Sequence, residues 1–244
     1  MKFLRALYAC YIFFWFTLLF LLFLPLLLIP ILFKNTHYLT GVINRIWAHI
    51  FFTLTLFPKR IVVNEKIDRT KQYIFCPNHF SYLDIPTMGL NPVNSIFVGK
   101  NDMEKIPLFG FMYKKLHITV DRNSLKSRYA TLVKSAQAVD DGKSLMIFPE
   151  GGIVSKNMPN MHRFKDGAFR IAIEKQIPIV PVTIPYNWII LPDDSLLPRL
   201  HTLKVVFHEP IKTNEMTLEK IEALKQKTFN VIDAELKRHL NEDR

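Results

Sequence analysis

The hydrophobic residues of the chain concentrate near its amino terminus. No charged residue occurs from position 7 to position 33, and a run of this length can cross a bilayer hydrocarbon core of ~30 Å. Pro25 and Pro30 interrupt its second half, so the pattern predicts a straight helix only over residues 7–24. A second apolar segment occupies residues 42–57, after a short polar turn. Two apolar helices joined by a turn predict a hairpin in the membrane.

The charges around these segments set the predicted orientation. Lys2 and Arg5 are the only charged residues among the first 33. A hairpin keeps them on the same side of the membrane as the rest of the chain, as the positive-inside tendency favours. Arg45 and His49 lie one helical turn apart in the second segment, which indicates an interfacial face or snorkelling side chains. A single membrane span and a buried core helix are the alternatives to the hairpin.

After Pro58, short apolar runs alternate with amphipathic stretches. This alternation predicts an α/β domain with a mostly parallel sheet flanked by helices. The chain therefore divides into membrane-anchoring hydrophobic helices at residues 1–57 and an α/β domain at residues 58–244. The predicted strands are residues 73–76, 95–98, 117–120, 145–148, 179–184 and 204–208. Helices are predicted between an N-cap at Ser124 and a stop at Gly142, at residues 164–175, and at residues 221–240.

Composition adds a strong positive charge to this picture. The formal net charge is +11, and a basic domain beside apolar helices suits an anionic membrane surface and phosphate-bearing substrates. The apolar anchor and the lack of a recognition motif argue against nucleic acid as a partner. The two cysteines are Cys10 in the apolar run and Cys76 in a predicted strand. They indicate no disulfide framework, so we expect the domain to face the reducing cytoplasm.

The candidate chemistry begins with His79 and Asp84. Imidazole is the usual group for taking a proton near neutral pH, and a nearby carboxylate orients it and stabilises its protonated form. On a continuous helix the two positions would lie ~140° apart, so they meet only if the chain turns between them. Pro77 after a predicted strand and a helix start at Asp84 predict this turn. The alternatives are a structural histidine and a helix-capping Asp84. A metal site is not indicated, because no second His or Cys stands at ligand spacing nearby.

Further polar residues follow other predicted strands. They are Asn78 and His79 after the first strand, Asp121 and Arg122 after the third, and Glu150 and Gly151 after the fourth. Because parallel sheets bind ligands beyond the carboxyl ends of their strands, we expect these residues to cluster. Arg122 offers a cation for phosphate, unless it pairs with Asp121 or Glu150. Glu150 precedes two glycines, which let a ligand approach the backbone closely or simply end the strand in a turn.

Several known motifs are absent. No Gly-x-Ser-x-Gly elbow occurs, which argues against a serine hydrolase, although Ser81 beside His79 keeps this class as an alternative. Residues 142–144 (GKS) resemble the end of a P-loop, but Gln137 stands where the first glycine of that motif belongs. No glycine-rich dinucleotide fingerprint is found.

Four blocks in order resemble the lysophosphatidic acid acyltransferase family, a group of glycerolipid acyltransferases. The blocks are Asn78-His79 to Asp84, residues 118–122 (ITVDR), residues 148–151 (FPEG) and residues 177–181 (IPIVP). Lys100 to Pro107, followed by Gly110, also resembles the segment that this family has between its first two blocks. The similarity covers about residues 61–185, which is most of the predicted domain. Four blocks in one order are a far more specific signal than any one of them.

The resemblance implies a fold, a mechanism and a site. The fold would be an α/β sheet domain on a membrane-embedded two-helix motif. His79 would act as general base on the acceptor hydroxyl, Asp84 would orient it, and the hydroxyl would attack an acyl thioester directly, without an acyl-enzyme. Acyl-CoA or acyl carrier protein would be the donor substrate, with no cofactor and no metal. The implied substrate-binding residues are Asn78, Lys100, Arg122, Glu150 and Gly151.

One departure from the family pattern concerns the third block. The family continues it with Gly-Thr-Arg, whereas this chain has Gly151-Gly152-Ile153, so a hydroxyl and a cation are missing. Lys156 or Arg163 in the following loop can supply the charge, and Lys165 and Arg170 can face anionic groups. The departure leaves the identity of the acceptor open.

The sequence therefore predicts a membrane-associated enzyme that transfers a fatty acyl group to the sn-2 hydroxyl of 1-acylglycerol-3-phosphate. The product would be phosphatidic acid for phospholipid biosynthesis. The active site would face the cytoplasm, at the inner membrane if the source is bacterial. An acyltransferase for another lysolipid, such as lyso-ornithine lipid, is the nearest alternative. A non-catalytic lipid-binding protein of the membrane surface is a third, and the His79–Asp84 pair argues against it.

Overall fold

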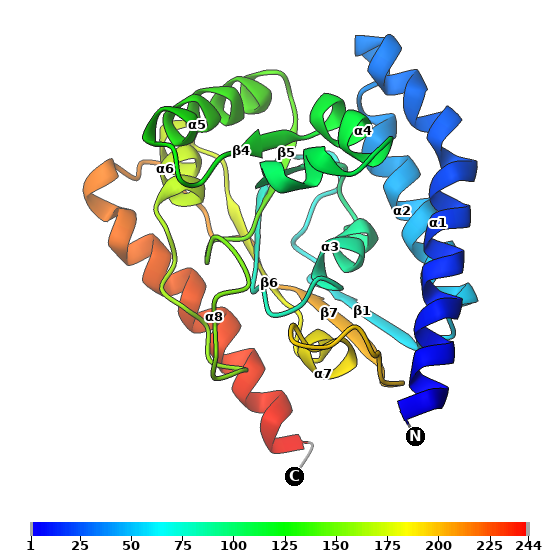
Figure 1. The fold of residues 1–244 in the computed structure, drawn as a ribbon. Coiled ribbons are helices and arrows are strands. Elements are labelled where there is room, and N and C mark those ends of the chain that lie inside the picture. The colour runs from blue at the N-terminus through cyan, green and yellow to red at the C-terminus, as the bar shows by residue number, and fades with distance from the viewer. Residues whose placement is uncertain (1, 243–244) are drawn as a thin grey trace.

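The computed structural model describes residues 2–242 and contains a seven-stranded sheet between layers of helices (Figure 1). The strands are β1 (Lys59–Val63), β2 (Ile74–Pro77), β3 (Ser95–Lys100), β4 (Ile118–Val120), β5 (Ser144–Ile147), β6 (Ile179–Thr183) and β7 (Leu203–Phe207). Their order across the sheet is β1-β7-β6-β2-β5-β3-β4. Neighbouring strands are parallel, except that β6 and β7 are antiparallel. The predicted α/β class with a mostly parallel sheet is confirmed.

The helices follow the predicted alternation. They are α1 (Lys2–Leu32), α2 (Leu39–Leu54), α3 (Asp84–Thr87), α4 (Phe109–Leu116), α5 (Leu125–Asp140), α6 (Gly167–Glu174), α7 (Asn187–Ile190) and α8 (Ile221–Glu242), with short 3-10 turns η1 (Lys34–Thr36), η2 (Met88–Leu90), η3 (Asn101–Lys105) and η4 (Leu218–Lys220). The predicted N-cap of α5 is confirmed, since the Ser124 hydroxyl accepts the Ser127 N–H at 3.2 Å. The start of α6 was predicted too early. Lys165 lies before the helix, because its N–H donates to the Pro149 carbonyl at 2.8 Å.

The six predicted strands all occur within one or two residues of their predicted bounds, and β1 was missed. β1 begins with Lys59 and Arg60, lies at the edge of the sheet, and has alternating exposure along its length. Only alternate side chains of β1 are half-buried, so the strand needs few apolar residues. The sequence signal for β1 was therefore weak.

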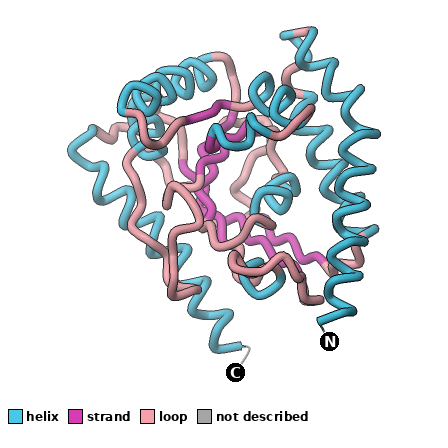
Figure 2. Tube along the Cα trace, in the orientation of Figure 1, coloured by secondary structure: helices cyan, strands magenta, loops and turns pink. Residues whose placement is uncertain are grey.

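The sheet separates two apolar layers, as expected from the alternation of side chains along a strand. Ile74 and Cys76 of β2 face a core built with α5, α6 and α8, whereas Tyr73 and Phe75 face the other core, beside Met88 of η2. Figure 2 shows helices on both sides of the strands. The loops that leave the carboxyl ends of β2, β3, β4, β5 and β6 are thereby held at one edge of the sheet.

The two predicted amino-terminal helices are present as α1 and α2. The predicted break at Pro25 and Pro30 does not end the helix, because α1 continues through both of them. Proline fits the φ angle of a helix and removes one backbone hydrogen bond, and an apolar helix with packing neighbours tolerates this loss. α1 is long and apolar enough to cross a membrane, and only 11% of its most apolar 18-residue window is buried. A fully buried core helix, one of the alternatives above, is therefore not what α1 forms.

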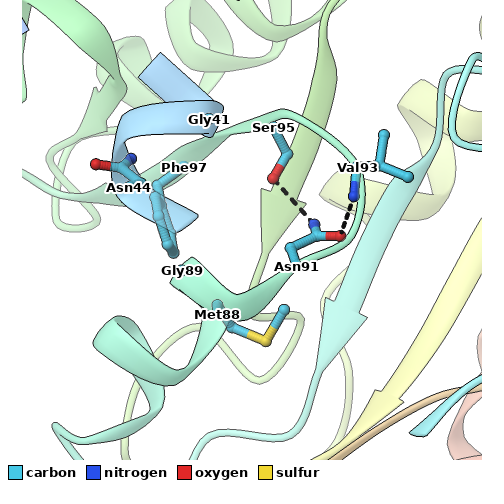
Figure 3. A pocket seen from close by; sticks show the side chains of 8 residues that line it. All are labelled: Gly41, Asn44, Met88, Gly89, Asn91, Val93, Ser95 and Phe97. Carbon is cyan, nitrogen blue, oxygen red and sulfur yellow. Dashed lines mark hydrogen bonds between the residues drawn. The ribbon is translucent and has the colours of Figure 1, made fainter. Parts of the chain in front are cut away.

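α2 is fastened to the α/β domain by Arg45. Its guanidinium donates to the Asn91 carbonyl at 2.7 Å and to Asn94 Oδ1 at 2.8 Å. The expectation that Arg45 serves an interfacial or snorkelling face is thus wrong, because its charge is used between α2 and the loop before β3. Asn91 also donates to Ser95 Oγ and accepts the Val93 N–H beside a small cavity (Figure 3). This polar junction sets how α2 sits on the domain.

Candidate active site

The loop between β2 and α3 carries His79 and is fixed to the neighbouring strand. Asn78 Oδ1 accepts the Ile184 N–H at 2.7 Å, and Asn78 Nδ2 donates to the Ile184 carbonyl at 3.0 Å. Asn78, which was predicted to bind substrate, lies fully buried and uses its amide on the backbone after β6. In the structure Asn78 fixes the position of His79, the next residue.

His79 and Asp84 meet, as the predicted turn requires. His79 Nδ1 lies 3.0 Å from Asp84 Oδ2, and the same oxygen accepts the Phe80 and Ser81 N–H groups at 2.8 and 2.9 Å. The carboxylate therefore points back into the loop, and Leu83 occupies the N-cap position of α3. The alternative in which Asp84 caps the helix is wrong.

A residue far along the chain completes the environment of Asp84. Asn187 of α7 donates from Nδ2 to Asp84 Oδ1 at 2.9 Å and to Thr87 Oγ1 at 2.9 Å. Both carboxylate oxygens thus have donors, although Asp84 is completely buried. Sequence reasoning missed Asn187, because nothing local marks a contact across more than one hundred residues.

The His79 ring is held in one orientation. It stacks on Phe148 with ring centroids 4.0 Å apart and an interplanar angle of 22°, and only 8% of the residue is exposed. Since Nδ1 faces Asp84, Nε2 lies on the opposite side of the ring, where it has no hydrogen-bond partner within residues 2–242. A histidine oriented in this way can take a proton at Nε2 while the carboxylate stabilises the imidazolium.

Glu150 supports the same loop from the end of β5. Its Oε1 accepts the His79 N–H and its Oε2 accepts the His162 N–H, both at 2.8 Å. Burial, together with the nearby Asp84 charge, raises the pKa of the Glu150 carboxyl to about 7, against the opposing effect of the two N–H donors. Glu150 was predicted to bind the acceptor, and in the structure both of its oxygens accept backbone hydrogen bonds.

Two cations lie against the glycine turn that follows Glu150. A Cβ atom at Gly151, where φ is +80°, would lie 2.5 Å from Lys165 Nζ, and a Cβ at Gly152 would lie 3.0 Å from Arg122 Nη1. No carboxylate within residues 2–242 lies within 4.0 Å of either cation. The salt bridges considered for Arg122 are therefore not formed, and both cationic groups lie against the turn without a carboxylate partner.

The other candidate cations are placed elsewhere. Arg163 pairs with Glu222 at 3.7 Å on the surface, and Arg170 pairs with Glu174 at 2.7 Å. Lys100 is exposed and pairs with Asp102, so its charge is shared with a carboxylate. Of Arg163 and Lys165, which both follow the altered third block in the sequence, Lys165 lies against it.

Ser81 has a supporting position. Its Oγ donates to the Leu191 carbonyl at 2.7 Å and accepts the Leu83 N–H at 3.1 Å. The hydroxyl hydrogen is directed at a carbonyl oxygen, away from any base. The structure therefore gives no support to Ser81 as a nucleophile.

Within residues 2–242, no three metal-ligating side chains gather.

The geometry defines a class of site, in which a carboxylate-held histidine and a cationic turn share the carboxyl edge of a parallel sheet. The chain belongs to the acyltransferase family, since the family model described as Acyltransferase matches residues 59–185, just over half of its length. The four-block resemblance is thus confirmed at the level of the family.

Individual relatives agree with this assignment. The chain is 30% identical to a 1-acyl-sn-glycerol-3-phosphate acyltransferase of Cocos nucifera over 66% of this chain and 52% of that protein. It is 29% identical to one of Saccharomyces cerevisiae over 76% of this chain and 62% of that protein. The chain thus spans between one half and two thirds of the length of these curated relatives.

A solved structure shares the fold along almost the whole chain. The crystal structure of the 1-acyl-sn-glycerophosphate acyltransferase PlsC from Thermotoga maritima superposes with a TM-score of 0.81 at 20% identity, over 98% of this chain and 97% of that one. The likeness therefore includes the amino-terminal helices as well as the sheet.

Proposed function

We propose that this chain is a membrane-associated 1-acylglycerol-3-phosphate O-acyltransferase that makes phosphatidic acid from an acyl thioester. The observation that carries the proposal is His79, oriented by a buried carboxylate and with Nε2 unpartnered, beside a turn flanked by two cations. Family membership supports the reaction class. The names of the relatives support the acceptor.

The proposed chemistry needs few groups. His79 Nε2 accepts the proton of the sn-2 hydroxyl while the hydroxyl oxygen attacks the thioester carbonyl. The carbon–sulfur bond breaks, the thiolate leaves, and Asp84 stabilises the imidazolium until its proton passes to the thiolate or to water. No cofactor takes part in this proposal, since acyl-CoA or acyl carrier protein is itself the donor. A thioester already carries a good leaving group, so positioning and proton transfer supply much of the rate.

The acceptor phosphate is assigned to the glycine turn. Arg122 and Lys165 offer positive charge there, because Gly151 and Gly152 have no side chains that would keep the two cations away from the turn. Lys165 supplies the charge that the altered third block lacks. The Glu150 oxygens face backbone donors, and a pKa of about 7 reduces the negative charge that a phosphate would meet at neutral pH.

Membrane attachment is assigned to α1. Its exposed apolar side chains include Phe3, Leu4 and Phe13, each more than two thirds exposed. Such a surface is unstable in water and suits the bilayer interior. The positive charges at the start of α1 favour an active site that faces the cytoplasm.

The test is acyl transfer by the detergent-purified chain from labelled acyl-CoA. Lysophosphatidic acid, monoacylglycerol and lyso-ornithine lipid are compared as acceptors. The proposal expects labelled phosphatidic acid, with monoacylglycerol at least tenfold poorer in kcat/KM because it lacks the phosphate that binds the cations. Preference for lyso-ornithine lipid would select the alternative acceptor. Hydrolysis without transfer would contradict the proposal.

A further inference from the structure

Helix α5 carries an unpaired row of apolar side chains on its outer face. Leu125, Tyr129 and Val133 are 75%, 70% and 53% exposed. They lie at positions i, i+4 and i+8, so successive members are offset by only ~40° around the helix. Single exposed apolar residues are common, but an aligned row on one helix is typical of a contact surface.

Cations border this row on both sides. At ~100° per residue, Arg128 lies on one side of the row and Lys126 on the other, with Lys134 beyond it. All three are exposed, and no carboxylate within residues 2–242 lies within 4.0 Å of them. No acidic residue occurs from position 122 to position 139. We give the name basic stripe to the three apolar and three cationic residues of α5, which are Leu125, Tyr129, Val133, Lys126, Arg128 and Lys134.

The position of the basic stripe points to a soluble partner. The main neighbours of α5 are β4, β5 and α6, whereas α1 contacts mainly α2 and α4. Figure 1 shows α5 on the flank of the domain opposite α1. The apolar row of α5 is therefore separate from the apolar surface of α1, which is the surface assigned to the bilayer. An apolar centre with charged surroundings is also the composition of a protein interface.

The stripe begins close to the candidate active site. α5 starts at Leu125, three positions after Arg122, whose guanidinium lies at the glycine turn. A partner bound over Leu125 and Tyr129 would thus sit close to Arg122 and the glycine turn of the candidate site. The protein that docks on the basic stripe can then be the molecule that carries the acyl thioester.

We propose that the basic stripe docks an acidic protein that carries the acyl group as a thioester, an acyl carrier protein. This inference rests on the proposed function, because the docked thioester is the donor for that same transfer. Opposite charges speed association and orient the carrier, and the apolar row forms the centre of the contact. Acyl-CoA, which has no protein surface, does not need the stripe.

The experiment compares the two donors with one acceptor, lysophosphatidic acid. The variant Lys126→Glu/Arg128→Glu/Lys134→Glu should raise KM for the acyl carrier protein donor by about tenfold or more. Its KM and kcat with acyl-CoA should stay within about twofold, which also shows that the variant is folded. Tyr129→Ser should act in the same direction with a smaller change. The control Lys212→Glu/Lys220→Glu/Lys227→Glu reverses three exposed lysines outside α5 and should leave both donors unaffected.

Each other outcome has a separate meaning. Equal loss with both donors, or a wild type that uses acyl-CoA but not the carrier, would overturn docking while the proposed function stands. Weaker binding to anionic vesicles with an unchanged carrier KM would place the stripe on the bilayer and also overturn it. Absence of transfer from either donor in the wild type would remove the proposed function itself.

Discussion

Glu150 is the residue whose charge state depends most on folding within the candidate site. Its carboxyl has a pKa of about 7 in the folded chain and an ordinary value of 4.5. Between these values the native state keeps a proton that the unfolded state releases. The contribution of Glu150 to the free energy of unfolding should therefore fall as pH rises from about 4.5 to about 7, by on the order of 3 kcal/mol at most, and be level above that range.

Glu150→Gln should remove this dependence. The variant loses one backbone acceptor and is less stable overall, but its unfolding free energy should fall less between pH 5 and pH 8 than that of the wild type. Urea unfolding in detergent at several pH values measures this difference. The exposed Glu209, which pairs with Lys66, provides the control substitution Glu209→Gln. Equal pH dependence in the wild type and Glu150→Gln would contradict the assigned pKa.

At the same scale, local spacing predicted one contact and could not predict the others. The His79–Asp84 pair was predictable because five positions across a strand–helix turn bring the side chains together. Asn187 and the His162 N–H reach the site from distant loops. Lys165 was predicted to face an anionic group, but its position beside Gly151 depends on the path of the loop between β5 and α6. Sequence patterns carry no such information.

The glycine turn after β5 is the element on which the acceptor assignment depends. Gly151→Ala places a side chain at φ +80° and against Lys165. Gly142→Ala meets the same kind of strain at φ +84° but has open space around it. Both substitutions should cost about 1–2 kcal/mol of unfolding free energy. Only Gly151→Ala should also raise KM for lysophosphatidic acid, because it displaces the cation.

Thermal unfolding and steady-state kinetics on the two alanine variants check this prediction. The matched strain of Gly142→Ala separates a loss of stability from a loss of binding. An unchanged acceptor KM in Gly151→Ala, or the same increase in both variants, would show that the turn does not hold the phosphate.

Among the elements, those with a strong periodic signal were predictable. α5 had its N-cap and its apolar spacing, and it forms between the predicted limits. β1 was missed because an edge strand that begins with two cations has little apolar pattern. The two prolines of α1 predicted a break, because proline usually ends a helix. The helix continues through them, since apolar surroundings tolerate the lost hydrogen bonds.

For the whole molecule, the alternation of strands and helices fixed the class but not the strand order. The antiparallel pairing of β6 with β7 depends on how loops cross the sheet, which no local pattern reveals. The same holds for the packing of α1 and α2 on the domain, where Leu19 and Phe52 share a core with Leu83 and Leu203. Helix α1, to which membrane attachment is assigned, thus shares a core with the segment that carries the candidate site.

The central claim is that His79 moves the proton during acyl transfer. The most direct measurement is kcat for transfer from acyl-CoA to lysophosphatidic acid by detergent-purified wild type and His79→Ala, with circular dichroism as the check of folding. Ser81→Ala, which alters the same loop without touching His79, serves as the control and should keep its kcat within about tenfold. We predict that His79→Ala, still folded, loses about 10²-fold to 10⁴-fold in kcat. A folded His79→Ala protein with a kcat near that of the wild type would contradict it.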